Sequence, residues 1–363
     1  MGPKLSSDRP LLKHLLMAAR LALLALFAAT AMAQTAQPAA GTAPATTPAQ
    51  PSATQNAVTP AAAPSKPADE GTEPAATFKA SINEVSVVFT VTDKHGRRIT
   101  DLKQSDFQVL DDNKPPAQIN SFHAETNLPL QVALLIDASN SVRDRFKFEQ
   151  ESAVEFLNQT IRPHYDQAVV IGFDATPEVT QDFTDDTVAL AHGVRELRPG
   201  GGTALYDALY YTCRDKLLKA PAAGTVRRAV ILLSDGEDNL SHVTREEAIE
   251  MAQRAEAIVY TISTNVSGTK SAGDKVLERI ADATGGRAFF PFQISEVANA
   301  FADIQDELRS QYAVSYKPAD LKYDGHYRTI EIVAKDSKNL RVRSRRGWYS
   351  PLPASASARA VAR

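Results

Sequence analysis

The stretch QVALLIDASNS, residues 131–141, decides how the middle of this chain folds. Its first part is continuously apolar, which is typical of a parallel strand that is buried on both faces of a sheet. Its second part places Asp137, Ser139 and Ser141 at alternate positions, a spacing that indicates a loop rather than one face of a helix. The stretch therefore predicts a buried strand that ends in a cluster of hard oxygen donors.

Residues 129–310 continue this strand with alternating helices and strands. Further strands are expected at AVVIGFDA, RRAVILLSD, IVYTIST and GRAFF. Helices are expected at SVRDRFKFEQESAVEFLNQTI, TVALAHGVREL, TALYDALYYTCRDKLL, TREEAIEMAQRAEA, KVLERIADAT and ISEVANAFADIQDELRS. Repeated strand–helix units predict an α/β fold with a doubly wound, mostly parallel, Rossmann-like sheet and right-handed crossovers.

Shorter segments with alternating apolar residues flank this centre. Residues 78–124 contain VSVVFTV, DFQVLDDNKPP and a short apolar segment at 119–122. After the centre come QYAVSYKP, HYRTIEIVAKD and NLRVRSRRGWY, and the turn residues KYDG predict that the first two are joined as a hairpin. Neither group makes an independent sheet, so we predict that residues 78–124 and 311–350 pair in one small β-rich module, with the central domain inserted between its halves.

The N-terminal residues predict export. Segments near both ends of the chain also predict disorder rather than folded structure. Residues 1–33 have the order of a secretory signal peptide: basic residues, the apolar run LALLALFAATAMA and the cleavage sequence AMA. An uncleaved anchor is the alternative, but this run is well short of the ~20 residues that a spanning helix needs. Residues 34–77, rich in Ala, Pro, Thr and Gln, predict a disordered linker, and residues 351–363 a disordered tail. We therefore expect a secreted or periplasmic protein with no stable membrane span after cleavage.

The charge of the chain gives no overall signature of binding to polyanions. The formal net charge of the 363 residues is -3, so we expect no nucleic-acid partner. One basic cluster, Arg341, Arg343, Arg345 and Arg346, places three arginines on one face of a strand. A charged edge strand that discourages aggregation is favoured there over a binding patch, whose ligand would be a polyanion of the cell envelope.

Three stretches carry the candidate site: DASNS at 137–141, GGGT at 200–203 and SDG at 234–236. The first and the last follow strands that should be neighbours, and the carboxyl ends of parallel strands meet at one edge of a sheet. The candidate ligands are Asp137, Ser139, Ser141, Thr203 and Asp235. Taken singly, each is explained as a helix cap or a turn residue. Together they form a set of hard oxygen donors that suits Mg²⁺ first, and Mn²⁺ or Ca²⁺ as alternatives, rather than zinc.

These three stretches resemble the metal ion-dependent adhesion site (MIDAS) of von Willebrand factor type A (VWA) domains. That site is written as D-x-S-x-S, a Thr in a Gly-rich loop, and an Asp that opens a D-G step. The flanking segments are similar to exported bacterial proteins grouped as VWFA-related, acidobacterial-type. The resemblance implies that the hydroxyls bind the metal directly while the aspartates often act through water. It also implies that the open coordination position takes a carboxylate from a partner protein.

Other acidic and histidine side chains near these loops are expected to be secondary. Glu237 is predicted to be a solvated charge, whereas Asp207 and Asp238 are left open between supporting the metal and simple solvation. None of the seven histidines lies in the three loops, and neither His192 nor His242 has an evident partner that would orient it as a base.

The sequence thus predicts a binding module and not an enzyme. It has no P-loop after the glycines, no dinucleotide fingerprint after the first strand and no G-x-S-x-G elbow. Aspartate-nucleophile phosphohydrolases need a second Asp at position 139, which is Ser here. We expect a metal-dependent, adhesion-type module that recognises an exposed Asp or Glu of a protein partner. A structural envelope protein with a purely stabilising metal, and a metal-dependent hydrolase, are the alternatives.

Overall fold

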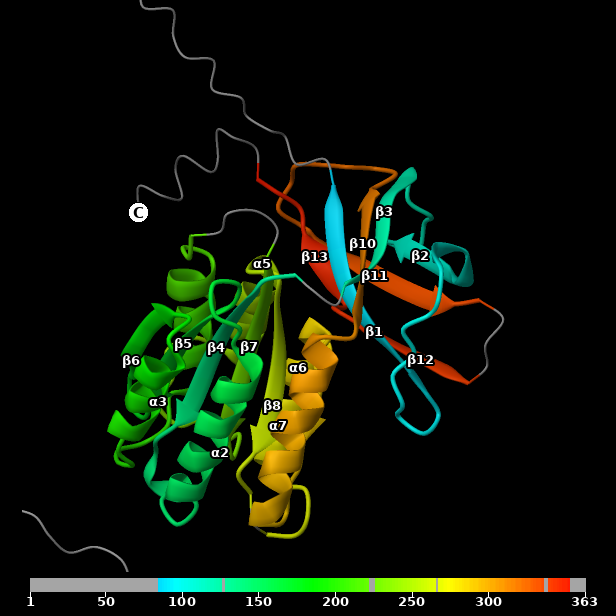
Figure 1. The fold of residues 1–363 in the computed structure, drawn as a ribbon. Helices are drawn as coiled ribbons and strands as arrows, with labels where there is room; N and C mark the ends of the chain where they lie inside the picture. The colour runs from blue at the N-terminus through cyan, green and yellow to red at the C-terminus, as the bar shows by residue number, and fades with distance from the viewer. Residues whose placement is uncertain (1–83, 126–127, 222–225, 266, 336–338, 353–363) are drawn as a thin grey trace, which may run out of the picture. The chain divides into compact units, whose positions relative to one another are not determined.

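The computed structural model describes residues 84–125, 128–221, 226–265, 267–335 and 339–352 (Figure 1). The signal peptide and linker predicted for residues 1–77 lie outside the described residues, as does nearly all of the predicted tail. Among the described residues, no helix is both long and apolar enough to cross a bilayer.

A six-stranded sheet forms the centre of the α/β domain. Its spatial order is β6-β5-β4-β7-β8-β9, and every neighbouring pair is parallel except β5 with β6. Its strands are β4 (Leu130–Asp137), β5 (Gln167–Phe173), β6 (Pro177–Thr184), β7 (Arg227–Ser234), β8 (Ala257–Ser263) and β9 (Ala288–Phe289). Every residue of β4 is buried, as predicted for a strand covered on both faces. The predicted mostly parallel α/β fold is therefore confirmed.

Helices cover both faces of this sheet. One face carries α2 (Phe146–Thr160), α3 (Thr187–Glu196) and α7 (Ile294–Leu308). The other face carries α4 (Leu205–Tyr211), a π-helix (Thr212–Leu217), α5 (Arg245–Arg254) and α6 (Ala272–Thr284). Figure 1 shows α2 and α7 side by side on the face turned to the viewer.

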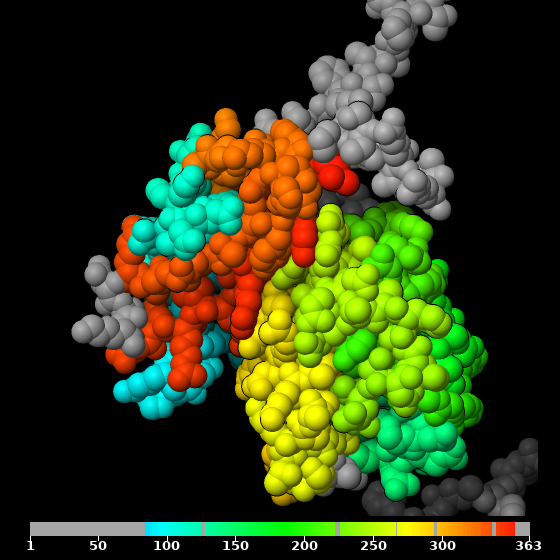
Figure 2. Space-filling model, turned by 180° about the vertical axis from the view of Figure 1, so that it is seen from behind, coloured from blue at the N-terminus to red at the C-terminus, as the bar shows by residue number. Residues whose placement is uncertain are grey.

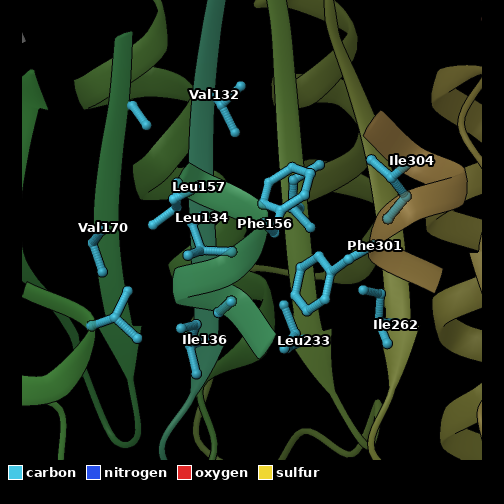
Figure 3. Packing of buried hydrophobic residues seen from close by; sticks show 14 of the residues in the cluster. Val132, Leu134, Ile136, Phe156, Leu157, Val170, Leu233, Ile262, Phe301 and Ile304 are labelled. Atoms are coloured by element: carbon cyan, nitrogen blue, oxygen red, sulfur yellow. The ribbon is translucent and has the colours of Figure 1, made fainter. Parts of the chain in front are cut away.

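Alternate residues of β4 divide between two hydrophobic cores, because successive side chains of a strand point to opposite faces. Val132, Leu134 and Ile136 pack in the core under α2 and α7 (Figure 3). There Phe156 of α2 stacks on Phe301 of α7, with ring centroids 4.9 Å apart and an interplanar angle of 29°. The stacked rings join the two helices over the middle of the sheet.

The sequence prediction missed the edge strand β6. It expected the chain to pass directly from AVVIGFDA to the helix now assigned as α3, whereas β6 folds back antiparallel to β5. Only Val179 and Phe183 of β6 pack against the core as partly buried apolar side chains. A half-exposed edge strand needs only one apolar face, so its pattern is weaker than that of the buried central strands.

Two helix predictions also differ from the structure in their limits. The helix expected from Ser141 begins at Phe146, because residues 140–142 form a short 3₁₀ turn first. The single helix expected over residues 203–218 is divided into α4 and the π-helix at Thr212.

The flanking segments form two further antiparallel sheets, of order β12-β1-β10-β3 and β13-β11-β2. Their N-terminal elements are β1 (Val85–Asp93), a 3₁₀ turn (Gln104–Asp106), β2 (Phe107–Asp111) and β3 (Gln118–Glu125). Their C-terminal strands are β10 (Gln311–Lys317), β11 (Tyr327–Ala334), β12 (Leu340–Ser344) and β13 (Gly347–Tyr349). Each N-terminal strand pairs only with C-terminal strands, which confirms that the two flanks build one β-module.

Two details of the predicted β-module are wrong. The expected hairpin across KYDG does not form, since β10 and β11 lie in different sheets. NLRVRSRRGWY is likewise divided between β12 and β13, one in each sheet. The carboxylate of Asp111 on β2 joins the sheets: it accepts hydrogen bonds from Tyr316 Oη (2.9 Å) and Trp348 Nε1 (3.1 Å). Packing two sheets face to face therefore decides the pairing here, not the local turn.

The arginine cluster holds the β-module to the α/β domain. β12 is an edge strand, as expected, but three of the four arginines pair with acids outside the module. Arg343 pairs with Glu307 of α7, while Arg345 pairs with Glu256 (3.2 Å) and Arg346 with Asp282 (3.5 Å). Figure 2 shows the red C-terminal segment against the yellow and yellow-green helices of the α/β domain. These contacts give the cluster a structural role.

Candidate metal centre

The two strands that end in aspartates are neighbours. β4 and β7 pair in parallel, with Ile136 opposite Leu233, so the loops that follow them leave the same edge of the sheet. Asp137 is the last residue of β4 and is 1% exposed. Asp235 follows β7 directly and is half-buried. This register places the two predicted acidic ligands side by side.

Hydrogen bonds orient the Asp137 carboxylate. Its Oδ1 accepts from the backbone N–H of Ser139 (2.9 Å), and its Oδ2 accepts from Ser234 Oγ (2.7 Å). The hydroxyls of Ser139 and Ser141 lie 2.9 Å apart. Ser234 was missed as a functional residue, although it stands beside Asp235 in the SDG stretch. Its contact with Asp137 depends on the pairing of β4 with β7, which cannot be read from the sequence around Ser234.

The glycine-rich loop is hydrogen-bonded to the loop that carries the serines. Gly200 N donates to Ala138 O (2.7 Å), and Asn140 Nδ2 donates to Gly201 O (3.1 Å). Gly201 has a φ of 68°, a left-handed conformation that glycine adopts without strain. The structure requires a glycine at position 201 because of this φ. A Cβ on Gly202 would lie 2.6 Å from Leu240 Cδ1, whereas one on Gly200 would meet nothing within 4 Å.

Thr203 joins the glycine-rich loop to the loop after β7. Its N–H donates to Asn239 Oδ1, and its carbonyl accepts from the N–H groups of Asn239 and Leu240, all at 3.0 Å. Asn239 is a second supporting residue that the sequence did not reveal. Through these contacts, all five predicted ligands lie on three loops that are hydrogen-bonded to one another.

Comparison with known proteins identifies a domain family for this part of the chain. Residues 132–237, from β4 to the loop after β7, match the family model of the von Willebrand factor type A domain. The chain contains a VWA domain. No curated protein matches the chain.

Solved structures are similar to part of this chain at low sequence identity. Proximal thread matrix protein 1 from the mussel byssus is 16% identical over 54% of this chain and 50% of its own, with a TM-score of 0.44. In one of its structures the MIDAS motif is occupied by zinc. The PilB minor pilin from Streptococcus sanguinis is 16% identical over 50% of this chain and 62% of its own, with a TM-score of 0.41. BatB from Bacteroides thetaiotaomicron is 18% identical over 50% of this chain and 100% of its own, with a TM-score of 0.40. This chain thus covers only about half the length of the mussel protein.

The electrostatics of the VWA domain suit a cation at this edge. Burial raises the pKa of Asp137 to about 6, and the nearby charge of Asp235 adds to the effect, against the hydrogen bonds from Ser234 and Ser139. Repulsion between the charges of Asp137 and Asp235 raises the free energy of the folded state. A divalent ion between the two carboxylates would relieve this repulsion. Among the described residues, no group of three or more His, Cys, Asp or Glu is arranged to hold a metal. The candidate ligands are the hydroxyl and carboxylate oxygens of the three loops, of which only Asp137 and Asp235 are acidic.

The other acidic residues near the VWA loops have structural partners. Asp207 accepts hydrogen bonds from the N–H groups of His242 and Val243 and pairs with His242 Nδ1 at 2.8 Å. Asp238 accepts from Ser241 Oγ at 2.5 Å. Both aspartates thereby hold the loop after β7 against α4. The expectation that His242 has no orienting partner is wrong, because Asp207 is 35 residues away in the sequence and reaches it only in the fold.

Proposed function

We propose that this VWA domain is a metal-dependent, adhesion-type protein-binding module and not an enzyme. It holds a divalent cation among Asp137, Ser139, Ser141, Thr203 and Asp235, with Mg²⁺ as first choice and Mn²⁺ or Ca²⁺ as alternatives. An exposed Asp or Glu of a partner protein binds on the open side of that ion. The observation that carries the proposal is the hydrogen bonding of the three loops, which gathers only hard oxygen donors at one edge of the sheet.

The exposure of the candidate ligands indicates where the partner binds. Asp137, Ser139 and Thr203 are buried, whereas Ser141 is exposed and Asp235 is half-buried. The side of the ion near Ser141 and Asp235 is therefore the side that a partner carboxylate reaches. Arg143 lies on the same rim, where its Nη2 donates to Asn140 Oδ1 (2.9 Å) and Pro199 O (3.3 Å). Its positive charge adds to the attraction for an acidic side chain.

No observation favours the hydrolase alternative. The Asp207–His242 pair lies near the site and could resemble an acid–base dyad, but the His242 side chain is 91% exposed. Asp207 is occupied by backbone N–H groups of the same loop. The alternative of a purely stabilising metal is an outcome of the test that follows.

The test compares wild type with Asp137→Ala, with Asp144→Ala as the matched control because Asp144 is an exposed acid of the same connection. Calorimetric titration with Mg²⁺, Mn²⁺ and Ca²⁺ should show binding by wild type and the control only. Envelope extract is then passed over each immobilised protein with metal or with chelator, and captured proteins are identified. A partner held by wild type and the control only in the presence of metal supports the proposal. Metal binding with no metal-dependent partner supports the stabilising ion, and absence of metal binding by wild type contradicts both.

We also infer that the protein is exported and resembles the VWFA-related, acidobacterial-type group in its β-module and VWA domain. Cleavage after Ala33 would leave a mature chain that begins at Gln34. N-terminal sequencing of protein recovered from the periplasm or medium of an expressing host tests this. A membrane-bound product that still begins at Met1 would contradict it.

A further inference from the structure

Glu149 of α2 is a buried acid at a position where the helix pattern calls for an apolar residue. It lies on the inner stripe of α2 with Ala153 and Phe156, four and seven residues further on, both of which pack in the core. Only 1% of Glu149 is exposed. Burying an unpaired carboxylate is strongly unfavourable, so its presence at this position needs a physical cause.

The surroundings of Glu149 leave its carboxylate without hydrogen bonds. Both oxygens are buried, and no described residue donates a hydrogen bond to either. The nearest cation is Arg145, whose Nε lies 3.9 Å from Oε1, beyond hydrogen-bonding distance. Arg145 is held in place by backbone carbonyls: Nη1 donates to Thr264 O (2.6 Å) and Nη2 to Pro291 O (3.4 Å). The arginine therefore offsets the charge of Glu149 without satisfying its oxygens.

Hydrogen bonds connect this arginine to the candidate metal centre. Thr264, whose carbonyl accepts from Arg145, donates its N–H to Ser234 O (3.0 Å), and Ser234 in turn donates to Asp137. Burial raises the pKa of Glu149 to about 8, with smaller contributions from the charges of Asp137 and Asp235 and against the effect of Arg145. When all three carboxyl groups are ionised, they and the guanidinium of Arg145 carry a net charge of −2. A divalent cation at the three loops would neutralise this charge, and Mg²⁺ keeps several bound waters that need acceptors.

We propose that Glu149 is a positioning residue of the metal centre, which would not contact the cation itself and whose carboxylate would accept hydrogen bonds from water bound to it. The inference rests on the proposed metal site, but not on the identity or existence of a protein partner. It explains why an acid occupies the inner stripe of α2 and why its oxygens have no donor among the described residues. Groups of this kind orient the waters and ligands around a metal, and their loss typically weakens metal binding 10- to 100-fold.

The experiment is a calorimetric titration of the full mature chain with Mg²⁺, in wild type, Glu149→Gln and Glu151→Gln. Glu151 is an exposed acid two residues further along α2, so its substitution makes the same change of charge outside the core. We expect the Kd of Glu149→Gln to rise 10- to 100-fold and that of Glu151→Gln to equal that of wild type. Glu149→Asp, which keeps the charge but shortens the side chain, should show a smaller rise and serves as the test if Glu149→Gln does not fold.

Melting curves in chelator and in saturating Mg²⁺ distinguish this role from a structural one. The rise in Tm caused by Mg²⁺ should shrink in Glu149→Gln and remain unchanged in Glu151→Gln. A Kd equal to that of wild type in the Glu149 variants, with a Tm changed by the same amount in metal and in chelator, would overturn the inference and leave the metal site standing. If wild type binds no divalent ion, the metal site and this inference fail together.

Discussion

At the scale of single residues, the VWA domain keeps two carboxyl groups where burial opposes their charge. Burial raises the pKa of Asp137 to about 6 and that of Glu149 to about 8, from ordinary values of 3.8 and 4.5. Each group binds its proton more tightly in the folded protein than in the unfolded chain. Both groups therefore stabilise the fold fully only at pH values below their unfolded pKa, and this stability is lost as the pH rises through the folded pKa.

The first prediction is a pH dependence of the metal-free protein. In chelator, the Tm of wild type should fall as the pH rises from 5 to 8, because a pKa of about 6 for Asp137 alone removes about 1.4 kcal/mol of stability above pH 5. Asp137→Asn should remove the part of this fall that lies near pH 6. Saturating Mg²⁺ should oppose the fall, since the ion binds the deprotonated carboxylates. A wild-type Tm that rises between pH 5 and pH 8 in chelator would contradict the raised pKa values of these two carboxyl groups.

The second prediction concerns Ser234, which the sequence did not reveal as part of the site. Its Oγ donates to Asp137 Oδ2 and accepts from Gly236 N at 3.0 Å. Ser234→Ala should raise the Kd for Mg²⁺ 10- to 100-fold, because the carboxylate loses the group that orients it. It should also lower the free energy of unfolding by about 1.5–3 kcal/mol, as expected for a hydrogen bond to a charged group. Ser105→Ala, in the 3₁₀ turn of the β-module, should change neither value measured by calorimetry and urea unfolding.

At the scale of elements, the site depends on loops whose backbone conformation is set by glycine and by hydrogen bonds between loops. Gly201 has a left-handed φ, and a Cβ there would also lie 2.7 Å from Asp174 Oδ2. Gly200 stands next to it in the same loop with open space around it. Substituting each glycine in turn therefore distinguishes the need for a left-handed φ at position 201 from a general need for small residues in this loop.

The third prediction compares these two glycines. Gly201→Ala should lower the free energy of unfolding by about 1–2 kcal/mol, the cost of a left-handed conformation for a residue with a Cβ. It should also weaken Mg²⁺ binding, because the loop that carries Thr203 is displaced. Gly200→Ala should stay within about 0.5 kcal/mol of wild type. Urea unfolding and calorimetry measure both effects, and equal behaviour of the two variants would mean that the conformation of Gly201 is not essential.

At the scale of the whole molecule, the β-module is built from segments that lie on either side of the VWA domain in the sequence. β1 pairs with β10 and β12, β2 with β11, and β3 with β10. The three N-terminal strands therefore have their hydrogen-bonding partners beyond residue 310. The VWA domain, in contrast, has both its hydrophobic cores within residues 129–310.

The fourth prediction follows from this division. A fragment of residues 78–124 should be unfolded, because none of its strands has a partner within it, whereas residues 129–310 alone should fold. Amide NMR spectra of the two fragments provide the measurement. Dispersed resonances from the 78–124 fragment would show that the N-terminal strands form a sheet by themselves and would contradict the shared module.

Features that depend on local pattern could be predicted from the sequence alone. Continuous apolar residues predicted that β4 is buried on both faces, and alternation with helices predicted the mostly parallel sheet. The stretches DASNS, GGGT and SDG predicted which loops lie at one edge of that sheet. These predictions succeed because side-chain periodicity and the carboxyl ends of parallel strands follow from the geometry of each element alone.

Only the tertiary structure decided which distant residues meet. The hydrogen bond from Ser234 to Asp137 joins residues that are 97 positions apart in the sequence. The pair of His242 and Asp207 joins residues that are 35 positions apart. Glu149 lies near the charges of the site only because α2 packs on the sheet. The division of β10 and β11 between two sheets also lay beyond local pattern. Alternation specifies that one face of a strand is buried, but the partner of that strand is chosen by the packing of whole sheets, which no short stretch of sequence records.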